Sequence, residues 1–348
     1  MTVRLIHVGL GGWGRNWEEV ALPRVPQIER VAIVDSDPAI LATAQETLGL
    51  PDELCFPSLD AALGAVKADA VLATVPLAAH VPVSLAALDA GLHVLVEKPF
   101  APSVAEAQTV VDAAEERGLT LMVSQNYRFF PAARLAQKLV QDQTLGLVGA
   151  VHLDFRFYSN QERTSGRPEL FHPLLVDMSI HHYDLIRMVL GQEPVEVSCV
   201  DTSPHWSHRG DFSGAVATIK LADGTVVSYR GSWVSTGPRT PWSGEWRIEC
   251  ADGEIAWTSR NGADLTGERV TIQKTGRKRA SKADLPTLPA TGRAGGLTEF
   301  ARAIKTGTEP ESSGRANLGT LALMEATVRS AASGRVEPVV TPSHGTSV

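Results

Sequence analysis

Residues 3–8, with the sequence VRLIHV, run directly into residues 9–14, GLGGWG, and this stretch decides the fold. An apolar strand-like run, a Gly-x-Gly-x-x-Gly turn and a helix-like segment are together typical of a unit that binds a dinucleotide. Gly9 allows the tight turn, Gly11 lets the backbone approach a pyrophosphate, and Gly14 lets the helix pack closely on the strand. The pyrophosphate is expected at the helix N-terminus, where unpaired N–H groups and the helix dipole favour an anion.

The next strand-like run ends at Asp35, which lies 21 residues beyond Gly14. A carboxylate at this distance binds the adenosine ribose hydroxyls and repels a 2′-phosphate, so the sequence favours NAD over NADP. NADP stays open as an alternative, because Ser36 and Arg15 can assist a phosphate. Residues 74–76, Thr-Val-Pro, end a later strand and are expected to pass the central ribose or phosphates of the cofactor.

The first 125 residues alternate β-branched runs with amphipathic segments. Strands are expected at residues 4–8, 31–35, 70–75, 93–97 and 120–124, and helices at 13–22, 38–48, 58–66, 79–90 and 103–117. Alternating units of this size predict a doubly wound parallel sheet of the Rossmann type with right-handed crossovers. Residues 1–125 are therefore predicted to form a dinucleotide-binding domain.

The pattern changes at about residue 126, where long alternating runs joined by Asp-Gly and Asn-Gly turns replace the earlier units. Such turns join antiparallel strands. Helices are expected at residues 132–143, 173–190, 296–306 and 315–333. The predicted fold class is α/β plus α+β, with the Rossmann domain followed by a domain built on a large, mainly antiparallel open sheet. Residues 126–335 are assigned to substrate binding and oligomerisation, with the last helix returning toward the first domain, and residues 336–348 to a frayed tail.

Tryptophan is concentrated in the second half of the chain, where residues 206–257 hold five of the seven. This concentration predicts a broad apolar face on the antiparallel sheet. Such a face must be covered, and another subunit can cover it. We therefore expect a homodimer or homotetramer that associates through this sheet.

The composition excludes some classes of partner. The formal net charge is −7 for 348 residues, whereas a protein that binds nucleic acid needs a basic surface. The apolar stretch 70–96 is interrupted by proline, histidine and aspartate, so no membrane span is expected. Cys55, Cys199 and Cys250 are widely spaced and form no Cys-x-x-Cys pair, which predicts buried thiols. No signal peptide precedes the first strand, and a cytoplasmic location is expected.

Two further motifs carry side chains suited to proton transfer. Lys98 follows an apolar run and lies at a strand end, where a doubly wound sheet presents its ligands. Asp177 and His181 are four residues apart, so they share one face of a helix. A carboxylate that orients an imidazole suits a base that takes a hydroxyl proton while a hydride leaves the carbon. His182 points about 100° away on the same helix, toward either the rim of the site or a backbone group.

A metal site built from Asp177, His181, His182 and Asp184 is an alternative interpretation. Zinc sites usually draw three or four ligands to one point. The adjacent histidines diverge, no cysteine assists them, and Lys98 already supplies the positive charge that hydride transfer needs. We therefore expect no metal.

Together these motifs resemble the family of glucose–fructose oxidoreductase, inositol dehydrogenase and rhizopine-catabolism oxidoreductases (Gfo/Idh/MocA). The resemblance covers nearly the whole chain. It rests on GLGGWG at 9–14, EKP at 97–99, NYRF at 126–129, DMSIHHYDL at 177–185 and AASGR at 331–335. One departure is Ser179, where many members carry glycine; this change leaves the spacing of Asp177 and His181 intact.

The resemblance implies that Lys98 contacts the reacting hydroxyl or the nicotinamide ribose, that His181 is the acid/base residue, and that Asp177 holds the imidazole or the substrate. It also implies subunit contacts through the open sheet. The residues expected to bind the cofactor are Gly9, Gly11, Gly12, Trp13, Gly14, Arg15, Asp35, Ser36, Thr74, Pro76, His80, Glu97, Lys98 and Asn126. The residues expected to contact the substrate are Arg128, Tyr158, Arg163 and His182.

The leading functional prediction is an NAD(P)-dependent oxidoreductase. It transfers a hydride between the nicotinamide and a secondary hydroxyl or ketone of a sugar, cyclitol or related polyol. One alternative is a non-catalytic regulatory protein that senses the dinucleotide, and the presence of Lys98, Asp177 and His181 argues against it. Another is an NAD-dependent glycosidase that uses transient oxidation, which tight cofactor retention and turnover without net reduction would identify.

Overall fold

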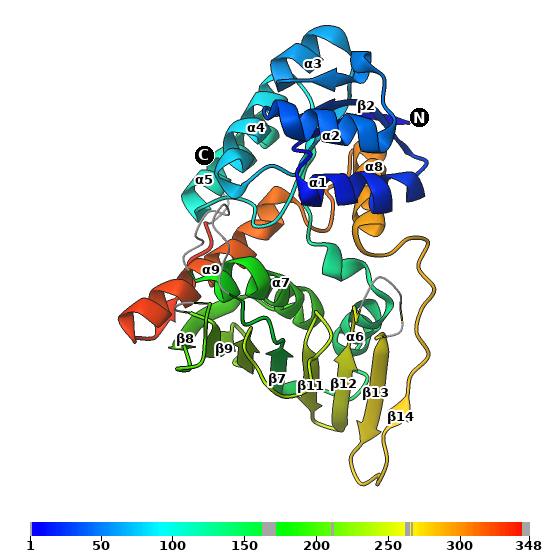
Figure 1. The fold of residues 1–348 in the computed structure, drawn as a ribbon. Helices are drawn as coiled ribbons and strands as arrows, with labels where there is room; N and C mark the ends of the chain where they lie inside the picture. Colours follow the sequence, from blue (N-terminus) through cyan, green and yellow to red (C-terminus); the bar gives the residue numbers. More distant parts are fainter. Residues whose placement is uncertain (1, 162–171, 210–211, 262–264, 266, 343–348) are drawn as a thin grey trace, which may run out of the picture. The chain divides into compact units, whose positions relative to one another are not determined.

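The computed structural model describes residues 2–161, 172–209, 212–261, 265 and 267–342 (Figure 1). The chain divides into two compact units. The first comprises Met1–Asn126 and Pro289–Leu318, and the second comprises Tyr127–Leu288 and Gly319–Val348. Residues 289–318 therefore group with the first unit, although the sequence pattern assigned them to the second domain.

The first unit contains a six-stranded sheet among its described residues. Its strands are β1 (Val3–Val8), β2 (Ile28–Val34), β3 (Cys55–Phe56), β4 (Ala70–Ala73), β5 (His93–Val96) and β6 (Leu121–Val123). The order is β3-β2-β1-β4-β5-β6, and every neighbouring pair is parallel. The chain thus leaves β1 toward β2 and later returns on the other side with β4, which makes the carboxyl end of β1 the switch point of the sheet.

The first unit also contains helices, most of which connect these strands. They are α1 (Gly12–Asn16), the π-helix η1 (Trp17–Ala21), the 3₁₀ helices η2 (Leu22–Arg24) and η3 (Asp52–Leu54), α2 (Pro38–Leu48), α3 (Leu59–Ala65), α4 (Leu77–Asp89), α5 (Val104–Glu116) and α8 (Gly292–Thr306). The helix expected at residues 13–22 is therefore three short pieces. Trp17 and Glu18 are consecutive and both buried, and the wider π turn lets two adjacent large side chains face inward.

Residues 289–318 join the first unit because they complete the edge of its sheet. Ser312 accepts a hydrogen bond at its carbonyl from Val123 N (2.8 Å), and its hydroxyl donates to Val123 O (2.7 Å). Arg315 forms an ion pair with Glu115 on α5. These bonds join residues that are up to 200 positions apart in sequence, so no local pattern could predict them.

The second unit contains a nine-stranded sheet among its described residues. Its strands are β7 (Val148–Arg156), β8 (Pro194–Thr202), β9 (Gly214–Leu221), β10 (Val226–Ser232), β11 (Glu245–Cys250), β12 (Gly253–Thr258), β13 (Arg269–Lys274), β14 (Ser281–Lys282) and β15 (Glu337–Pro338). The order is β14-β13-β12-β11-β7-β10-β9-β8-β15. All pairs are antiparallel except β7 and β10. The predicted fold class, a Rossmann sheet plus a mainly antiparallel sheet, is confirmed.

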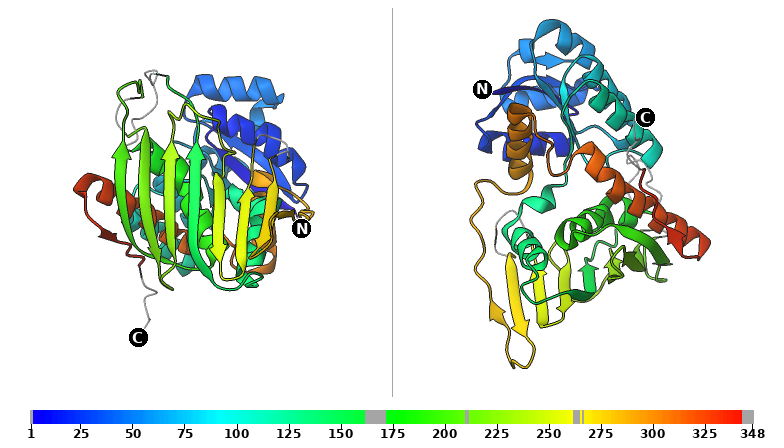
Figure 2. Two further views of the ribbon diagram at one scale, coloured as in Figure 1. Left: turned by 90° about the horizontal axis from the view of Figure 1, so that it is seen from below. Right: turned by 180° about the vertical axis from the view of Figure 1, so that it is seen from behind.

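The helices of the second unit gather on one face of this sheet. They are α6 (Pro131–Gln141), the π-helix η5 (Leu174–Met178), α7 (Ser179–Leu190) and α9 (Gly314–Ser333) from residue 319 onward. Figures 1 and 2 show α6 and α7 over one face, while the view from below shows strands with none of these helices in front of them. The short 3₁₀ helix η4 (Asn126–Phe129) leads into α6.

The sheet's tryptophans do not lie on its open face, and this corrects the prediction. Trp246 and Trp257 are buried and stacked on one another with ring centroids 4.7 Å apart. Exposed positions alternate with buried ones along the central strands and carry charges instead. The ion pairs are Arg230–Asp154 (2.6 Å), Arg156–Glu245 (2.7 Å), Arg247–Glu254 (2.9 Å), Lys220–Glu196 (3.3 Å) and His152–Glu249 (3.3 Å). The open face therefore carries many charges, although Val200, Val216 and Val226 are also exposed along β8, β9 and β10.

The C-terminal segment also differs from its prediction. Glu337 and Pro338 form β15 on the edge of β8, and Val339 N donates to Val195 O (3.0 Å). The expectation of a frayed tail from residue 336 is wrong at its start, because β8 offers an unpaired edge that this segment satisfies. In the part of the chain that the structure describes, no helix is long and apolar enough to cross a membrane.

Candidate active site

The glycine turn after β1 has the geometry that a dinucleotide needs. Gly9 has a φ of +94°, and a Cβ there would meet the Thr74 backbone at 2.8 Å. A Cβ on Gly14 would meet Gly9 O at 1.9 Å, so helix and strand approach too closely for any side chain. A Cβ on Gly11 or Gly12 would meet nothing within 4 Å, which leaves open space beside the backbone where α1 begins. These glycines therefore fit a pyrophosphate group.

Asp35 has a second role that its motif did not indicate. Its Oδ2 accepts a hydrogen bond from Leu10 N (2.7 Å), inside the glycine turn, and its Oδ1 accepts one from Asp37 N (2.9 Å). A carboxylate has about four acceptor positions, so acceptor capacity remains for ribose hydroxyls. Asp35 thus fits the adenosine ribose and also anchors the turn that binds the pyrophosphate. Ser36, beside it, is exposed.

Beneath the turn lies a buried polar chain that the sequence analysis missed. Thr74 Oγ1 donates to Gly9 O (2.5 Å), and His7 Nε2 lies 2.8 Å from the same hydroxyl. His7 Nδ1 lies 2.7 Å from the carboxylate of Glu18. The alternation of polar His7 with apolar neighbours in β1 was its only sequence signal. Thr74 therefore supports the glycine turn through its bond to Gly9 O. Pro76, two residues later, is exposed and occupies the N-cap position of α4.

His80 joins two loops of the cofactor edge. Its Nδ1 lies 2.8 Å from Pro99 O and its Nε2 lies 3.0 Å from Val75 O, and the ring is buried. Burial lowers the pKa of this histidine, against smaller opposing effects of the two carbonyls. Both ring nitrogens are engaged by the backbone, so these bonds do not support the expected cofactor contact, which stays a prediction. His80 ties the loop after β4 to the loop after β5.

Glu97 is likewise engaged by protein partners, and its cofactor contact stays a prediction. Its side chain is 4% exposed and accepts hydrogen bonds from Trp13 Nε1 (3.0 Å), Trp17 Nε1 (2.9 Å) and Lys98 N (3.0 Å). The Ser124 hydroxyl adds a longer bond of 3.3 Å. Glu97 therefore links the glycine-turn helices to the end of β5.

The other expected cofactor residues have different degrees of exposure. Lys98 and Arg15 are half-buried, Trp13 is largely exposed, and Asn126 is buried at the start of η4. Lys98 lies two residues beyond the end of β5, at the carboxyl edge where a doubly wound sheet binds its ligands.

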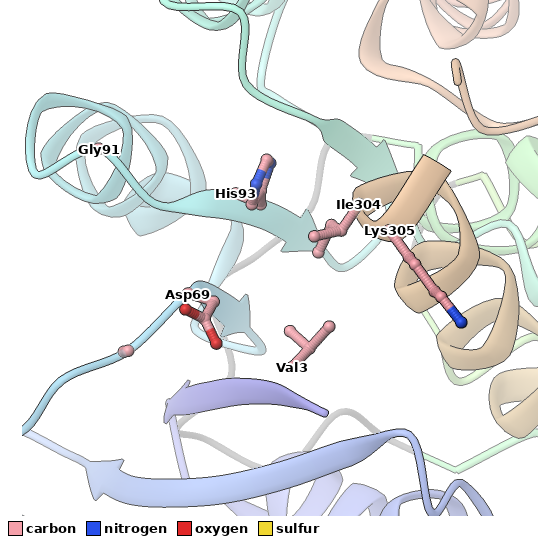
Figure 3. Close-up of a pocket in the computed structure, with 7 residues that line it drawn as sticks. Val3, Asp69, Gly91, His93, Ile304 and Lys305 are labelled. Carbon is pink, nitrogen blue, oxygen red and sulfur yellow. The ribbon is translucent and has the colours of Figure 1, made fainter. Parts of the chain in front are cut away.

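A pocket of about 290 Å³ lies at the opposite edge of the same sheet (Figure 3). Val3 and His93 begin β1 and β5, and Asp69 precedes β4, so this pocket lies at the amino ends of the strands. Ile304 and Lys305 of α8 complete its lining. None of the residues expected to bind cofactor or substrate lines it.

In the second unit, Asp177 and His181 lie on consecutive turns of different type. Asp177 is exposed within the π-helix η5, whereas His181 is 5% exposed in the first turn of α7. The sequence predicted one regular helix here. Single π turns occur often at functional sites, and this one offsets Asp177 from a regular α-helical position. Ser179, between them, is buried with its hydroxyl 2.7 Å from Tyr229 Oη.

His181 is held by an aromatic stack that sequence reasoning missed. Its ring lies 4.0 Å from that of Tyr127 with an interplanar angle of 7°. The guanidinium of Arg260 lies 4.2 Å from the centre of the same Tyr127 ring. Two planar groups cannot share one face at such distances, so Tyr127 lies between the imidazole and the guanidinium.

The backbone of Arg260 is fixed from both sides. Its φ is +62°, a left-handed conformation that side chains other than glycine rarely adopt. Its N–H donates to Glu268 Oε1 (2.7 Å), and its carbonyl accepts from Trp242 N (3.0 Å). Glu268 is buried and also accepts from Ala132 N (2.8 Å) at the start of α6. The surrounding contacts thus maintain a strained residue beside the stack.

His182 takes one of the two roles expected for it, contact with a backbone group, and its substrate contact stays a prediction. It is fully buried, with Nδ1 3.2 Å from Tyr229 Oη and Nε2 3.0 Å from Trp242 O. Burial lowers the pKa of His182 to about 4, although its bond to Trp242 O opposes this shift. Because Trp242 N–H binds the carbonyl of Arg260, His182 supports the loop that carries Arg260.

Arg128 is also occupied by protein partners. It forms two hydrogen bonds of 2.7 Å with the buried carboxylate of Asp184 on α7. This pairing gives Arg128 a structural role, and substrate contact stays a prediction without support from these bonds. Tyr158 is exposed and forms an isolated antiparallel β-bridge with Val234. Arg163 lies outside the described residues. Within the described ranges, no group of three or more His, Cys, Asp or Glu side chains is arranged to hold a metal ion.

Comparison with known proteins decides the family. Residues 3–125 match the oxidoreductase family with an NAD-binding Rossmann fold, and residues 133–256 match the Gfo/Idh/MocA C-terminal domain. The chain belongs to the Gfo/Idh/MocA oxidoreductase family. Its membership confirms the resemblance seen in the motifs and the prediction of an NAD-binding oxidoreductase.

Members of this family that resemble the chain act on sugars and cyclitols. The 1,5-anhydro-D-fructose reductase of Ensifer adhaerens is 26% identical over 82% of this chain and 84% of its own length. The inositol 2-dehydrogenase of Rhizobium meliloti is 26% identical over 96% of this chain and 98% of its own. The aldose-aldose oxidoreductase of Caulobacter crescentus, crystallised with glycerol, has the same fold with a TM-score of 0.82. It is 23% identical and covers 97% of this chain and 100% of its own.

Proposed function

We propose that this Gfo/Idh/MocA oxidoreductase transfers a hydride between NAD and a secondary hydroxyl or ketone of a sugar, cyclitol or related polyol. The observation that carries the proposal is the fixed placement of His181 against Tyr127, four residues after Asp177. A buried imidazole with a fixed ring plane is suited to exchange a proton with a hydroxyl. The named relatives that reduce an anhydrosugar and oxidise inositol support the substrate class.

The proposed roles divide the reaction among three side chains. NAD, held by the glycine turn and Asp35, would supply the acceptor for the hydride that leaves the carbinol carbon. His181 takes the proton of the hydroxyl, and Lys98 provides positive charge that stabilises the developing alkoxide. Asp177, exposed in the π turn, orients the imidazole or binds a second substrate hydroxyl. In the reducing direction the same groups return the proton to the new alkoxide.

We also propose that NAD is preferred to NADP. The Asp35 carboxylate at the end of β2 would repel a 2′-phosphate, and its hydrogen bond to Leu10 N keeps it beside the glycine turn. Replacement of Asp35 is therefore expected to weaken NAD binding by two routes, the lost ribose contact and a looser turn.

We propose, finally, that subunits associate through the open face of the second-unit sheet as a homodimer or homotetramer. The apolar reason given by the sequence is wrong, because Trp246 and Trp257, the tryptophans on the strands, are buried and stacked on one another. The support is now the rows of alternating charge on that face, which can pair with the same rows in a second copy.

The decisive experiment is a panel of sugars and polyols, including inositol, assayed with NAD and NADP by the absorbance of the reduced nicotinamide. With a substrate found, His181→Ala and Lys98→Ala are each expected to lower kcat at least about a hundredfold. Asp177→Asn should give a smaller loss. His205→Ala, at an exposed histidine, is the matched control and should leave turnover unchanged. Near-normal turnover in His181→Ala would contradict the proposed mechanism.

A further inference from the structure

Trp13 is the most prominent exposed side chain of the glycine turn, with 44% of its surface exposed. Its position is nevertheless fixed. The indole N–H donates to Glu97 Oε1 (3.0 Å), and the guanidinium of Arg293 lies 4.4 Å from the centre of the ring. Arg293 is itself held by Asn16 and lies 5.2 Å from the ring of Trp17. One face of the indole is thus covered by Arg293, and the exposure belongs to the rest of the ring.

The contacts of Trp13 place it on a definite side of the switch point. The glycine turn follows β1, whose neighbours are β2 on one side and β4, then β5, on the other. Asp35 at the end of β2 marks the adenosine side. The Trp13 ring extends from the turn to Glu97, directly after β5. It therefore lies on the side of the switch point that holds β4 and β5.

A dinucleotide bound at a switch point lies across it, with its two halves on opposite sides. The pyrophosphate occupies the glycine turn, and the adenosine half extends toward Asp35. The nicotinamide half must then extend over β4 and β5, toward Lys98. The oriented, exposed face of Trp13 lies along this path, within the first unit alone.

We propose that Trp13 is the platform on which the nicotinamide ring packs, and that it favours the oxidised cofactor. The nicotinamide ring of NAD⁺ carries a positive charge, whereas that of NADH is neutral. An indole face attracts a cationic ring more strongly than a neutral one. Glu97 and Arg293 fix the indole before the cofactor arrives, so little conformational entropy is lost on binding. The proposal rests on the NAD site of the proposed function but not on the identity of the substrate.

The test compares three ligands by calorimetric titration: NAD⁺, NADH and ADP-ribose, which has every part of the cofactor except the nicotinamide. Trp13→Ala is expected to lower the affinity for NAD⁺ about tenfold and the affinity for NADH by a smaller factor. The affinity for ADP-ribose should stay within about twofold of that of the unmodified protein. Trp13→Phe keeps an aromatic face and should retain most of the affinity for NAD⁺. Trp206→Ala removes a tryptophan that is 56% exposed in the other unit, and this control should change none of the three.

The outcomes separate the platform from a purely structural role. If Trp13→Ala weakens ADP-ribose as much as NAD⁺, Trp13 only supports the turn and the proposal is overturned. Unchanged affinity for all three ligands overturns it as well. A Trp13-dependent affinity for NAD⁺ together with no turnover of any sugar or polyol would support the platform and contradict the proposed substrate class.

Discussion

At the scale of single residues, a stack of planar groups holds the proposed base, with Tyr127 between His181 and Arg260. Lys98, Asp177 and His181 stand in motifs whose spacing indicates their chemistry. Tyr127 and Arg260 are far apart in sequence, and neither periodicity nor spacing connects them to His181. Only the folded chain brings the three planar groups together. The same reason explains why the sequence left the role of His182 open, since its partners Tyr229 and Trp242 come from other elements.

Arg260→Gly tests whether this stack positions the proposed base. Glycine adopts a φ of +62° without strain, so thermal stability should be unchanged or higher. Loss of the guanidinium removes one side of the Tyr127 stack and should lower kcat about tenfold while the Kd for NAD stays constant. Added guanidinium ion should restore part of the rate. A partly unfolded enzyme would not respond to guanidinium in this way, and an unchanged kcat would show that Arg260 does not position His181.

His182 predicts a pH dependence of stability. Its pKa is about 4 when folded, because of burial, and 6.5 is its ordinary value. Between these values the unfolded chain binds a proton that the folded protein does not, so stability falls as pH decreases through this window. This contribution of His182 to the free energy of unfolding is fully present above about pH 6.5 and amounts to about 3 kcal/mol.

Urea unfolding of His182→Gln at several pH values checks this expectation. The glutamine amide can still donate to Trp242 O but does not titrate, so the acid-side loss of stability should become smaller. His80 and His172, whose pKa values are also lowered by burial, still contribute to the dependence of stability on pH in this variant. His205→Gln is the exposed control. An unchanged slope in His182→Gln would contradict the assignment.

At the scale of elements, local pattern predicted most of the first sheet but not its irregular parts. β1, β4 and β5 begin within one residue of the expected positions, because apolar runs between helices define them. The two-residue β3 carries too little pattern to detect. The π turns η1 and η5 were expected as regular helix, because a local sequence window does not show that consecutive residues will both be buried.

Glu97→Gln is expected to loosen the link between α1, η1 and the end of β5. One carboxylate oxygen accepts from two indoles, and the other accepts from Lys98 N. A glutamine amide group must turn its NH₂ toward one of these donors and leave it unsatisfied in a buried site. The expected loss is about 1–3 kcal/mol in unfolding free energy, with weaker NAD binding. Glu19→Gln, at an exposed position of η1, should change neither. Wild-type stability in Glu97→Gln would show that these hydrogen bonds contribute little.

At the scale of the whole molecule, the charges on the open sheet determine how subunit association should depend on salt. An apolar interface strengthens or persists in concentrated salt, whereas one built on exposed ion pairs weakens. We expect dimers or tetramers in sedimentation at micromolar concentration, with dissociation as salt approaches about 1 M. Arg230→Glu sets a like charge beside Asp154 at the centre of the sheet and should favour the monomer. Arg277→Glu, in the exposed turn between β13 and β14, is the matched charge reversal and should not. Salt-resistant association, or a monomer at every concentration, would show that this face does not form the interface we propose.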